Sequence, residues 1–199
     1  MEHMMRLALA LAFALTTLTV HADENLAVQM DAIAPILASG NLEELGGPDT
    51  HEAIVEGIDG RWFTLKNTAR NWEGSGSADR ERLARSIERT CSDSWENILT
   101  YEVIAPGAFI AAQRTPAGVD KGTFEIQPAE SGMRTFRTFV DDDYFLGLLD
   151  LEGADAAKKE AELSKFRDLM NKGFEIWRPT PDLLIISRVD DFEIWGRCP

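Results

Sequence analysis

Residues 98–140, ILTYEVIAPGAFIAAQRTPAGVDKGTFEIQPAESGMRTFRTFV, decide the fold. Short segments rich in β-branched and aromatic residues alternate here with turn sequences, namely Pro106-Gly107, Pro116-Ala117-Gly118 and Ser131-Gly132. The alternation predicts strands over residues 98–104, 108–114, 122–127 and 133–140. Parallel neighbours would need connections of roughly a dozen or more residues, so these strands are expected to pair antiparallel.

The rest of the chain adds strands on both sides of this stretch, with helices between them. Aromatic and β-branched runs predict further strands over residues 60–66, 144–149, 174–178, 183–189 and 192–198. Apolar residues at helical spacing predict helices over residues 24–38, 49–56, 78–90 and 154–172. We therefore expect an α+β fold, in which helices pack on an antiparallel sheet or barrel of roughly eight or nine strands.

The N-terminus has the features of a cleavable secretory signal. Arg6 precedes an apolar run, residues 7–18, that is shorter than the roughly 20 residues needed to span a bilayer. Val20-His21-Ala22 places small residues at the −3 and −1 positions of a cleavage site. The prediction is a signal peptide over residues 1–22, followed by a single mature domain over residues 23–199 that is periplasmic or secreted and has no membrane span.

The chain is strongly acidic, with 20 lysines and arginines against 34 aspartates and glutamates and a formal net charge of −14. This charge would repel nucleic acids and anionic membrane surfaces, so we expect neither as a partner. Acidity favours solubility, and it would also favour a basic protein partner. The oligomeric state stays open.

Two cysteines, Cys91 and Cys198, are widely separated in the sequence. An even number of cysteines in an exported protein is most simply paired, and these two form no Cys-x-x-Cys redox motif. We expect a structural disulfide that closes a loop of about 100 residues and stabilises the fold by up to ~4–5 kcal/mol on the chain-entropy estimate. Cys91 extends the apolar stripe of Leu83 and Ile87, so its sulfur is expected to face the core.

The tetrapeptide Phe-Glu-Ile-Trp occurs twice, at residues 174–177 and 192–195. Strand alternation predicts a shared core face for Phe174, Ile176, Phe192 and Ile194, with Cys198 on the same side. Trp177 and Trp195 would then lie on the opposite face. They would either form an exposed aromatic patch that binds a ligand, or be covered by one of the helices.

Residue types that commonly catalyse reactions are few or scattered after the signal. His51 is the one histidine of residues 23–199, the sequence has no Gly-x-Ser-x-Gly motif, and we interpret His51 as a surface residue near a helix start. Asp141, Asp142 and Asp143 match no calcium-binding loop and are interpreted as a solvated turn between two strands. No catalytic residue, metal site or cofactor is predicted, and a carboxylate pair remote in sequence stays open as an alternative.

Gly60-Arg61-Trp62-Phe63 opens the first predicted strand, and Gly196-Arg197-Cys198 closes the last. The first motif resembles the Gly-x-Trp opening of the lipocalins, and the second is similar to the end of small bacterial exported lipocalin-like domains. The resemblance implies a closed antiparallel barrel with an apolar ligand pocket. The five tryptophans and ten phenylalanines of the chain would suit such a pocket, and Trp62 joins Trp177 and Trp195 as a candidate binding residue.

Two functions are consistent with these features. The first is an exported non-catalytic protein that binds a small apolar ligand or a protein partner in the cell envelope. The alternative is a carboxylate-based hydrolase of envelope material, in which Asp141–Asp143 or His51 would take part. A closed pocket lined by phenylalanine and tryptophan would favour binding, whereas an open cleft with two convergent carboxylates would favour hydrolysis.

Overall fold

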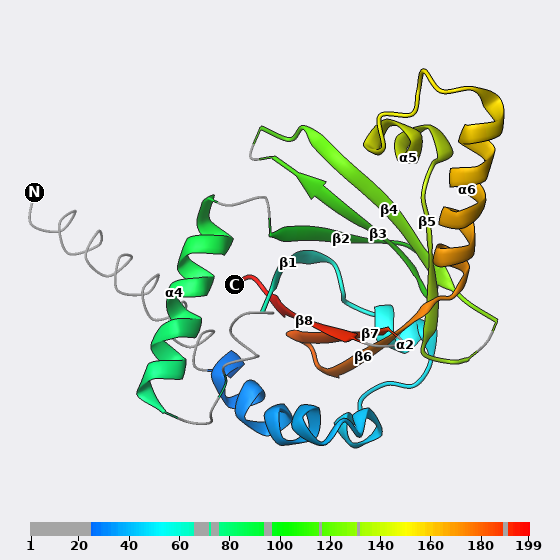
Figure 1. Cartoon of the computed structure of the whole chain (residues 1–199). Coiled ribbons are helices and arrows are strands. Elements are labelled where there is room, and N and C mark those ends of the chain that lie inside the picture. The colour runs from blue at the N-terminus through cyan, green and yellow to red at the C-terminus, as the bar shows by residue number, and fades with distance from the viewer. Residues whose placement is uncertain are drawn as a thin grey trace, which may run out of the picture.

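Eight antiparallel strands close into a barrel in the computed structural model (Figure 1). The structure describes residues 25–65, 72, 76–93, 97–115, 117–130, 132–188 and 191–199. The strands are β1 (Gly60–Thr64), β2 (Ile98–Ala105), β3 (Ala108–Arg114), β4 (Asp120–Pro128), β5 (Thr135–Phe139), β6 (Phe174–Thr180), β7 (Leu183–Arg188) and β8 (Asp191–Arg197).

Each strand pairs with its neighbour in the chain, and the last strand pairs back with the first. Trp62 of β1 lies opposite Leu99 of β2 on one side and opposite Arg197 of β8 on the other. Closure gives each of these eight strands two partners, so none of the strands that the structure describes has an open edge. The predicted antiparallel pairing and the α+β class are confirmed, and of the two predicted forms, sheet or barrel, the barrel is present.

Helices pack around the barrel and plug one of its ends (Figure 1). They are the N-terminal helix (residues 25–39), the 3-10 helix η1 (Leu42–Leu45), α2 (His51–Val55), α4 (Ser77–Asp93), α5 (Asp142–Leu148) and α6 (Ala156–Asn171). The helices predicted over residues 24–38, 49–56, 78–90 and 154–172 are therefore present, with small shifts of their ends. None of the described helices is long and apolar enough to cross a membrane.

Strands next to the helices are buried on both faces, which gives the molecule an inner and an outer core. The inner core fills the barrel, and at the end that α2 closes, Ile54 and Ile58 pack with Trp62. The outer core lies between the barrel wall and the N-terminal helix and α4, and it includes Phe63 and Leu83. Trp62 and Phe63 are both fully buried, because strand alternation sends one into the barrel and the other under the helices.

The two Phe-Glu-Ile-Trp segments face opposite ways, which corrects the prediction that they share a core face. In the register of β6, β7 and β8, Trp177 lies opposite Ile185, and Ile185 lies opposite Ile194. These three side chains belong to the outer core, whereas Phe174 and Trp195 turn into the barrel. The register places the fourth residue of one copy level with the third residue of the other, so identical segments present opposite faces.

Residues 144–149, expected to form a strand, instead lie in helix α5 and at its end. The Asp141 side chain caps this helix by accepting a hydrogen bond from the Tyr144 backbone N–H at 3.0 Å. Asp142 and Asp143 lie in the first turn, where the helix dipole favours carboxylates. The three aspartates therefore begin a helix, and their interpretation as a turn between two strands was wrong.

Cys91 and Cys198 form a disulfide between α4 and the residue that follows β8, with 5.6 Å between their Cα atoms. Both cysteines pack against the outer core, as the position of Cys91 on the apolar stripe predicted. Arg61 supports the same junction by donating a hydrogen bond from Nη1 to the Cys91 carbonyl oxygen at 2.9 Å. The disulfide therefore fastens α4 to the barrel wall.

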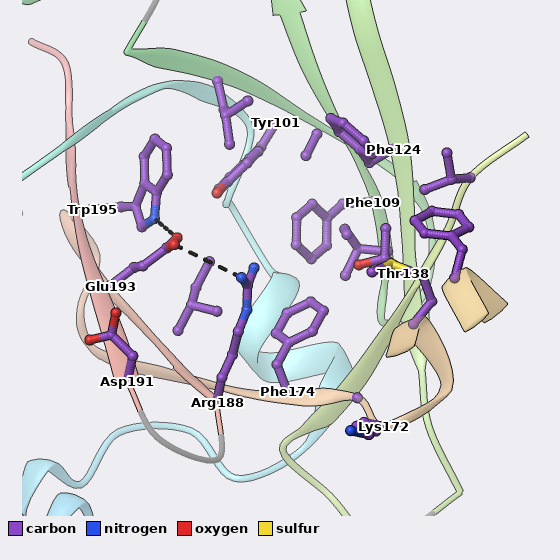
Figure 2. Close-up of a pocket in the computed structure, with 18 of the residues that line it drawn as sticks. Tyr101, Phe109, Phe124, Thr138, Lys172, Phe174, Arg188, Asp191, Glu193 and Trp195 are labelled. Carbon is purple, nitrogen blue, oxygen red and sulfur yellow. Dashed lines mark hydrogen bonds and ion pairs between the residues drawn. The ribbon is translucent and has the colours of Figure 1, made fainter. Parts of the chain in front are cut away.

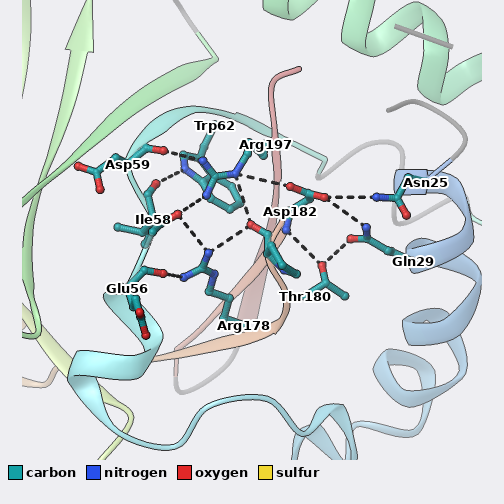
Figure 3. Close-up of polar contacts among 12 residues, drawn as sticks. Asn25, Gln29, Glu56, Ile58, Asp59, Trp62, Arg178, Thr180, Asp182 and Arg197 are labelled. Atoms are coloured by element: carbon teal, nitrogen blue, oxygen red, sulfur yellow. Dashed lines mark hydrogen bonds and ion pairs between the residues drawn. The ribbon is translucent and has the colours of Figure 1, made fainter. Parts of the chain in front are cut away.

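Two arginines hold the closed end of the barrel together (Figure 3). Arg178 donates hydrogen bonds to four backbone carbonyl oxygens, those of Ile54, Glu56, Gly57 and Pro181. Arg197 donates to the carbonyl oxygens of Gly57 and Asp59, and its guanidinium lies 4.6 Å from the centroid of the Trp62 ring. The segment after α2 is thereby tied to β6 and β8.

Candidate functional site

The half of the barrel away from α2 holds a cavity of about 670 Å³ (Figure 2). Along β7, Leu184 packs in the inner core near α2, while Ile186 and Arg188 line the cavity. Ligand pockets typically have volumes of roughly 300–1,000 Å³. The other lining residues are Leu99, Tyr101, Phe109, Ala111, Phe124, Ile126, Thr138, Val140, Phe145, Phe166, Met170, Lys172, Gly173, Phe174, Asp191, Glu193 and Trp195.

A chain of ring contacts builds the aromatic part of the cavity wall and joins it to the closed end. Tyr101 stacks on Trp62 with ring centroids 5.9 Å apart and contacts Phe109 at 5.1 Å. Phe136 lies between Phe109, at 6.3 Å, and Phe174, at 6.5 Å. Each of these rings therefore packs against at least one neighbouring ring.

Glu193 is the most buried of the four charged residues that line the cavity, the others being Lys172, Arg188 and Asp191. Its carboxylate accepts a hydrogen bond from the Trp195 indole N–H at 3.3 Å, and its Oε1 lies 4.0 Å from Nη1 of Arg188 (Figure 2). The Arg188 side chain is 61% exposed and the Glu193 side chain 32% exposed. The negative charge is therefore the one held inside the barrel.

Tyr101 places a hydroxyl group in the same cavity (Figure 2). Burial raises the pKa of Tyr101 well above its ordinary value, and the nearby charge of Glu193 raises it further. The phenol therefore stays protonated over the physiological pH range and can donate a hydrogen bond to a ligand.

Helices α5 and α6 form one wall of the cavity, outside the barrel strands. Phe145 and Phe166 stack with ring centroids 3.7 Å apart, and both line the cavity. The two helices have a small core of their own, made of Leu146, Leu151 and Leu163. This wall is therefore a packing unit separate from the barrel cores.

Of the three tryptophans predicted as candidate binding residues, Trp195 alone lines the cavity. Trp62 is fully buried, and its indole N–H donates to the Ile58 carbonyl oxygen at 2.8 Å. Trp177 is buried in the outer core, with the Arg134 guanidinium 4.3 Å from its ring centroid. Trp177 and Trp195 lie on opposite faces of the wall, so the exposed patch that one alternative predicted is not formed by this pair.

Sequence reasoning missed most of the cavity wall, including Tyr101, Phe109 and Glu193. A closed barrel sends alternate residues of every strand inward. Alternation places Leu99 with Tyr101 on one face of β2, and Phe109 with Ala111 on one face of β3, but it does not say which face turns inward. The inward face of β8 could not be predicted without its pairing register. It consists of Asp191, Glu193 and Trp195 and is less apolar than the opposite face, so the sequence favours the wrong face as the inner one.

His51 and the aspartates 141–143, which would take part in the hydrolase alternative as catalytic groups, have structural roles outside the cavity. Nε2 of His51 lies 2.8 Å from the Thr135 carbonyl oxygen, and the imidazole ring meets Phe136 edge-on at 4.9 Å. Asp142 pairs with Arg167 of α6. None of these residues lines the cavity. In the part of the chain that the structure describes, no group of three or more histidine, cysteine, aspartate or glutamate side chains is arranged to hold a metal ion.

Comparison with known proteins leaves the site to be interpreted from its own geometry. No model of a protein family, no curated protein and no solved structure matches this chain.

Proposed function

We propose that this protein is an exported, lipocalin-like binding protein that holds a small apolar molecule inside its barrel. The observation that carries the proposal is the cavity of about 670 Å³, most of whose lining residues are aromatic or aliphatic. Transfer of an apolar molecule from water to such a wall is favourable by roughly 25 cal/mol for each Å² of apolar surface removed from water. The aromatic lining favours binding over hydrolysis as the role of this cavity.

The contact between the two ends of the barrel supports the lipocalin-like assignment. The Gly60–Phe63 and Gly196–Cys198 motifs, which carry the resemblance, lie side by side because β1 pairs with β8. Trp62 and Arg197 are direct register partners, and the guanidinium covers the indole ring at the closed end. Trp62 and Arg197, which belong to the two motifs that resemble lipocalins, are therefore in contact with each other at the closed end of the barrel.

Export is proposed on two grounds. Residues 1–22 have the charge and apolar pattern of a signal peptide, and they lie outside the described residues. The Cys91–Cys198 disulfide is of the kind that persists in oxidising compartments, such as the periplasm or the extracellular space. A barrel that carries an apolar molecule would work in either place.

Calorimetric titration with a neutral apolar probe, 1-naphthalenemethanol, tests the proposed function. Ala111 lines the cavity, so Ala111→Phe should fill part of it and weaken binding by about 10-fold or more. Val119→Phe adds the same side chain at a position that is 52% exposed, and it should leave the affinity unchanged. Absence of binding to the natural chain, or equal binding to both variants, would contradict a ligand site in the barrel.

Native mass spectrometry of protein purified from its own envelope provides a second test. A bound molecule that leaves on unfolding, and that Ala111→Phe reduces relative to Val119→Phe, is the expected result. A partner protein that copurifies equally with both variants would instead favour a role in protein binding.

A further inference from the structure

The four charged residues that line the cavity differ in how exposed they are to water. Glu193 is partly buried between Trp195 and the barrel interior, whereas Arg188, Asp191 and Lys172 are exposed. A ligand that enters the barrel therefore meets a carboxylate as the most enclosed charge. The other charged lining residues are two cations, Lys172 and Arg188, and one carboxylate, Asp191, and all three are more accessible to water.

Arg188 already places a cation at this carboxylate. Its guanidinium lies 4.0 Å from Glu193 and 6.0 Å from the centroid of the Phe174 ring. Aromatic ring faces attract cations within about 6 Å, so carboxylate and ring act on the same group. The position beside Glu193 and Phe174 is thus compatible with a positive charge in a cavity whose lining residues are mostly apolar.

The ion pair between Arg188 and Glu193 is weak enough for the cation of a ligand to replace the guanidinium. At 4.0 Å its pair with Glu193 is at the limit of an ion pair, and the arginine side chain is 61% exposed. Exposed pairs of this kind contribute little to stability, and the long side chain can move into water at small cost. The Glu193 side chain is more restrained, because it is 32% exposed and its carboxylate accepts the indole hydrogen bond of Trp195.

We propose that the cavity selects apolar molecules carrying one positive charge, an ammonium or guanidinium group that docks on Glu193 in place of Arg188. This selectivity rests on the proposed function, since it assumes that the cavity takes a ligand. The apolar part of the molecule would lie against Phe109, Phe124 and Phe174, and the Tyr101 hydroxyl would donate to any acceptor that the molecule carries. The net charge of −14 would attract such cations to the protein.

The test compares three probes with the same naphthyl group, by calorimetric titration near neutral pH: 1-naphthylmethylammonium, 1-naphthalenemethanol and 1-naphthoate. The natural chain should bind the ammonium at least about 10-fold more tightly than the alcohol, and the naphthoate least tightly. Glu193→Gln should remove the preference for the ammonium and leave the affinity for the alcohol within about two-fold. Arg188→Gln should strengthen ammonium binding, because it removes the competing cation.

The second Phe-Glu-Ile-Trp segment supplies a matched control. Glu175 accepts a hydrogen bond from Trp177 at 3.3 Å, the same contact that Glu193 makes with Trp195, but outside the cavity. Glu175→Gln should therefore keep the full preference for the ammonium. Retained binding of the alcohol by Glu193→Gln shows that this variant is folded, so a lost preference cannot be attributed to unfolding.

The other outcomes separate the two proposals. Equal affinity for all three probes would overturn the selectivity and leave the proposed function standing. The same would follow if the naphthoate bound most tightly and Arg188→Gln lost that binding. Failure of the alcohol to bind the natural chain would overturn the proposed function, and the selectivity with it. A preference for the ammonium that Glu175→Gln removes as strongly as Glu193→Gln would also overturn the selectivity, since the overall charge would then be its source.

Discussion

At the scale of single residues, Arg178 shows how one buried side chain can organise an end of the barrel. It is 8% exposed, and its hydrogen bonds reach carbonyl oxygens of α2 and of the segment that follows α2. Burial lowers the pKa of Arg178, and the positive charge of Arg197 lowers it further. The carbonyl oxygens and the buried guanidinium therefore depend on each other.

Arg178→Met should lower the free energy of unfolding by about 2–4 kcal/mol, because it removes the arginine donor from the carbonyl oxygens of Ile54 and Glu56, whereas Arg197 still donates to that of Gly57. Urea denaturation measures the change. Arg85→Met is the control, since the Arg85 side chain is exposed and its pair with Glu81, at 3.6 Å, is exposed as well. The control should change stability by no more than about 0.5 kcal/mol. Equal effects of both substitutions would contradict the role given to Arg178.

Tyr101 gives a pH-dependent signal from inside the cavity wall. The chain has two tyrosines, so Tyr144→Phe leaves Tyr101 as the only source of tyrosinate absorbance at 295 nm. The pKa of Tyr101 is raised, so the unfolded chain loses this proton first, and stability should fall as pH rises above the ordinary tyrosine value of about 10. The absorbance should therefore rise only when the barrel unfolds. A reversible ionisation near pH 10 with unchanged circular dichroism would show that Tyr101 is exposed to water.

At the scale of elements, the junction between α6 and β6 depends on a glycine. Gly173 has φ = 70°, and a Cβ atom there would lie 2.9 Å from the Phe136 carbonyl oxygen. Gly40, after the N-terminal helix, has φ = 73° but no heavy atom within 4 Å of such a Cβ. An alanine at either position would be strained by the positive φ, but only at Gly173 would its Cβ atom also be too close to a neighbouring atom.

Gly40→Ala should therefore destabilise the protein by about 1 kcal/mol, and Gly173→Ala by about 2–4 kcal/mol. Thermal unfolding of the two variants, followed by circular dichroism, measures the difference. If Gly173→Ala were no more destabilising than Gly40→Ala, the close approach of the α6–β6 junction to Phe136 of β5 would be wrong.

The elements also show what local sequence could and could not predict. Strands β2, β3 and β4 follow from their turns and their β-branched residues, because hairpin geometry is local. The segment after Asp141 contains Tyr144 and Phe145, which favour strands, but the three aspartates cap and begin a helix whose apolar face packs on α6. Tertiary contacts with α6 therefore override the local strand preference.

Strand β8 shows a second limit of sequence reasoning. Phe192 was expected in the core, yet it is 37% exposed, whereas Glu193 enters the barrel. Alternation fixes which residues share a face of one strand, but the pairing register decides which face turns inward. The residues of β8 that line the cavity therefore could not be predicted without the order and register of β7, β8 and β1.

At the scale of the whole molecule, the disulfide joins residues separated by 107 positions and holds α4 against the barrel. The double variant C91S/C198S should lose about 2–5 kcal/mol of stability in urea denaturation, chiefly because its unfolded chain is less restricted. Alkylation of the natural protein under denaturing conditions, without reductant, should label neither cysteine. Labelling of both cysteines would contradict the disulfide and remove one ground for export.

Strand β8 is oriented so that Trp195 and Glu193 line the cavity of the barrel, where we propose that the ligand binds. A brominated apolar alcohol, 10-bromodecan-1-ol, quenches tryptophan fluorescence on contact and so reports which indole meets the ligand. Titration of Trp195→Phe and Trp177→Phe with this probe tests the claim most directly. Trp195→Phe should lose most of the quenching seen in the natural chain, and Trp177→Phe should keep it. Full quenching in Trp195→Phe, or its loss in Trp177→Phe, would contradict a ligand site inside the barrel.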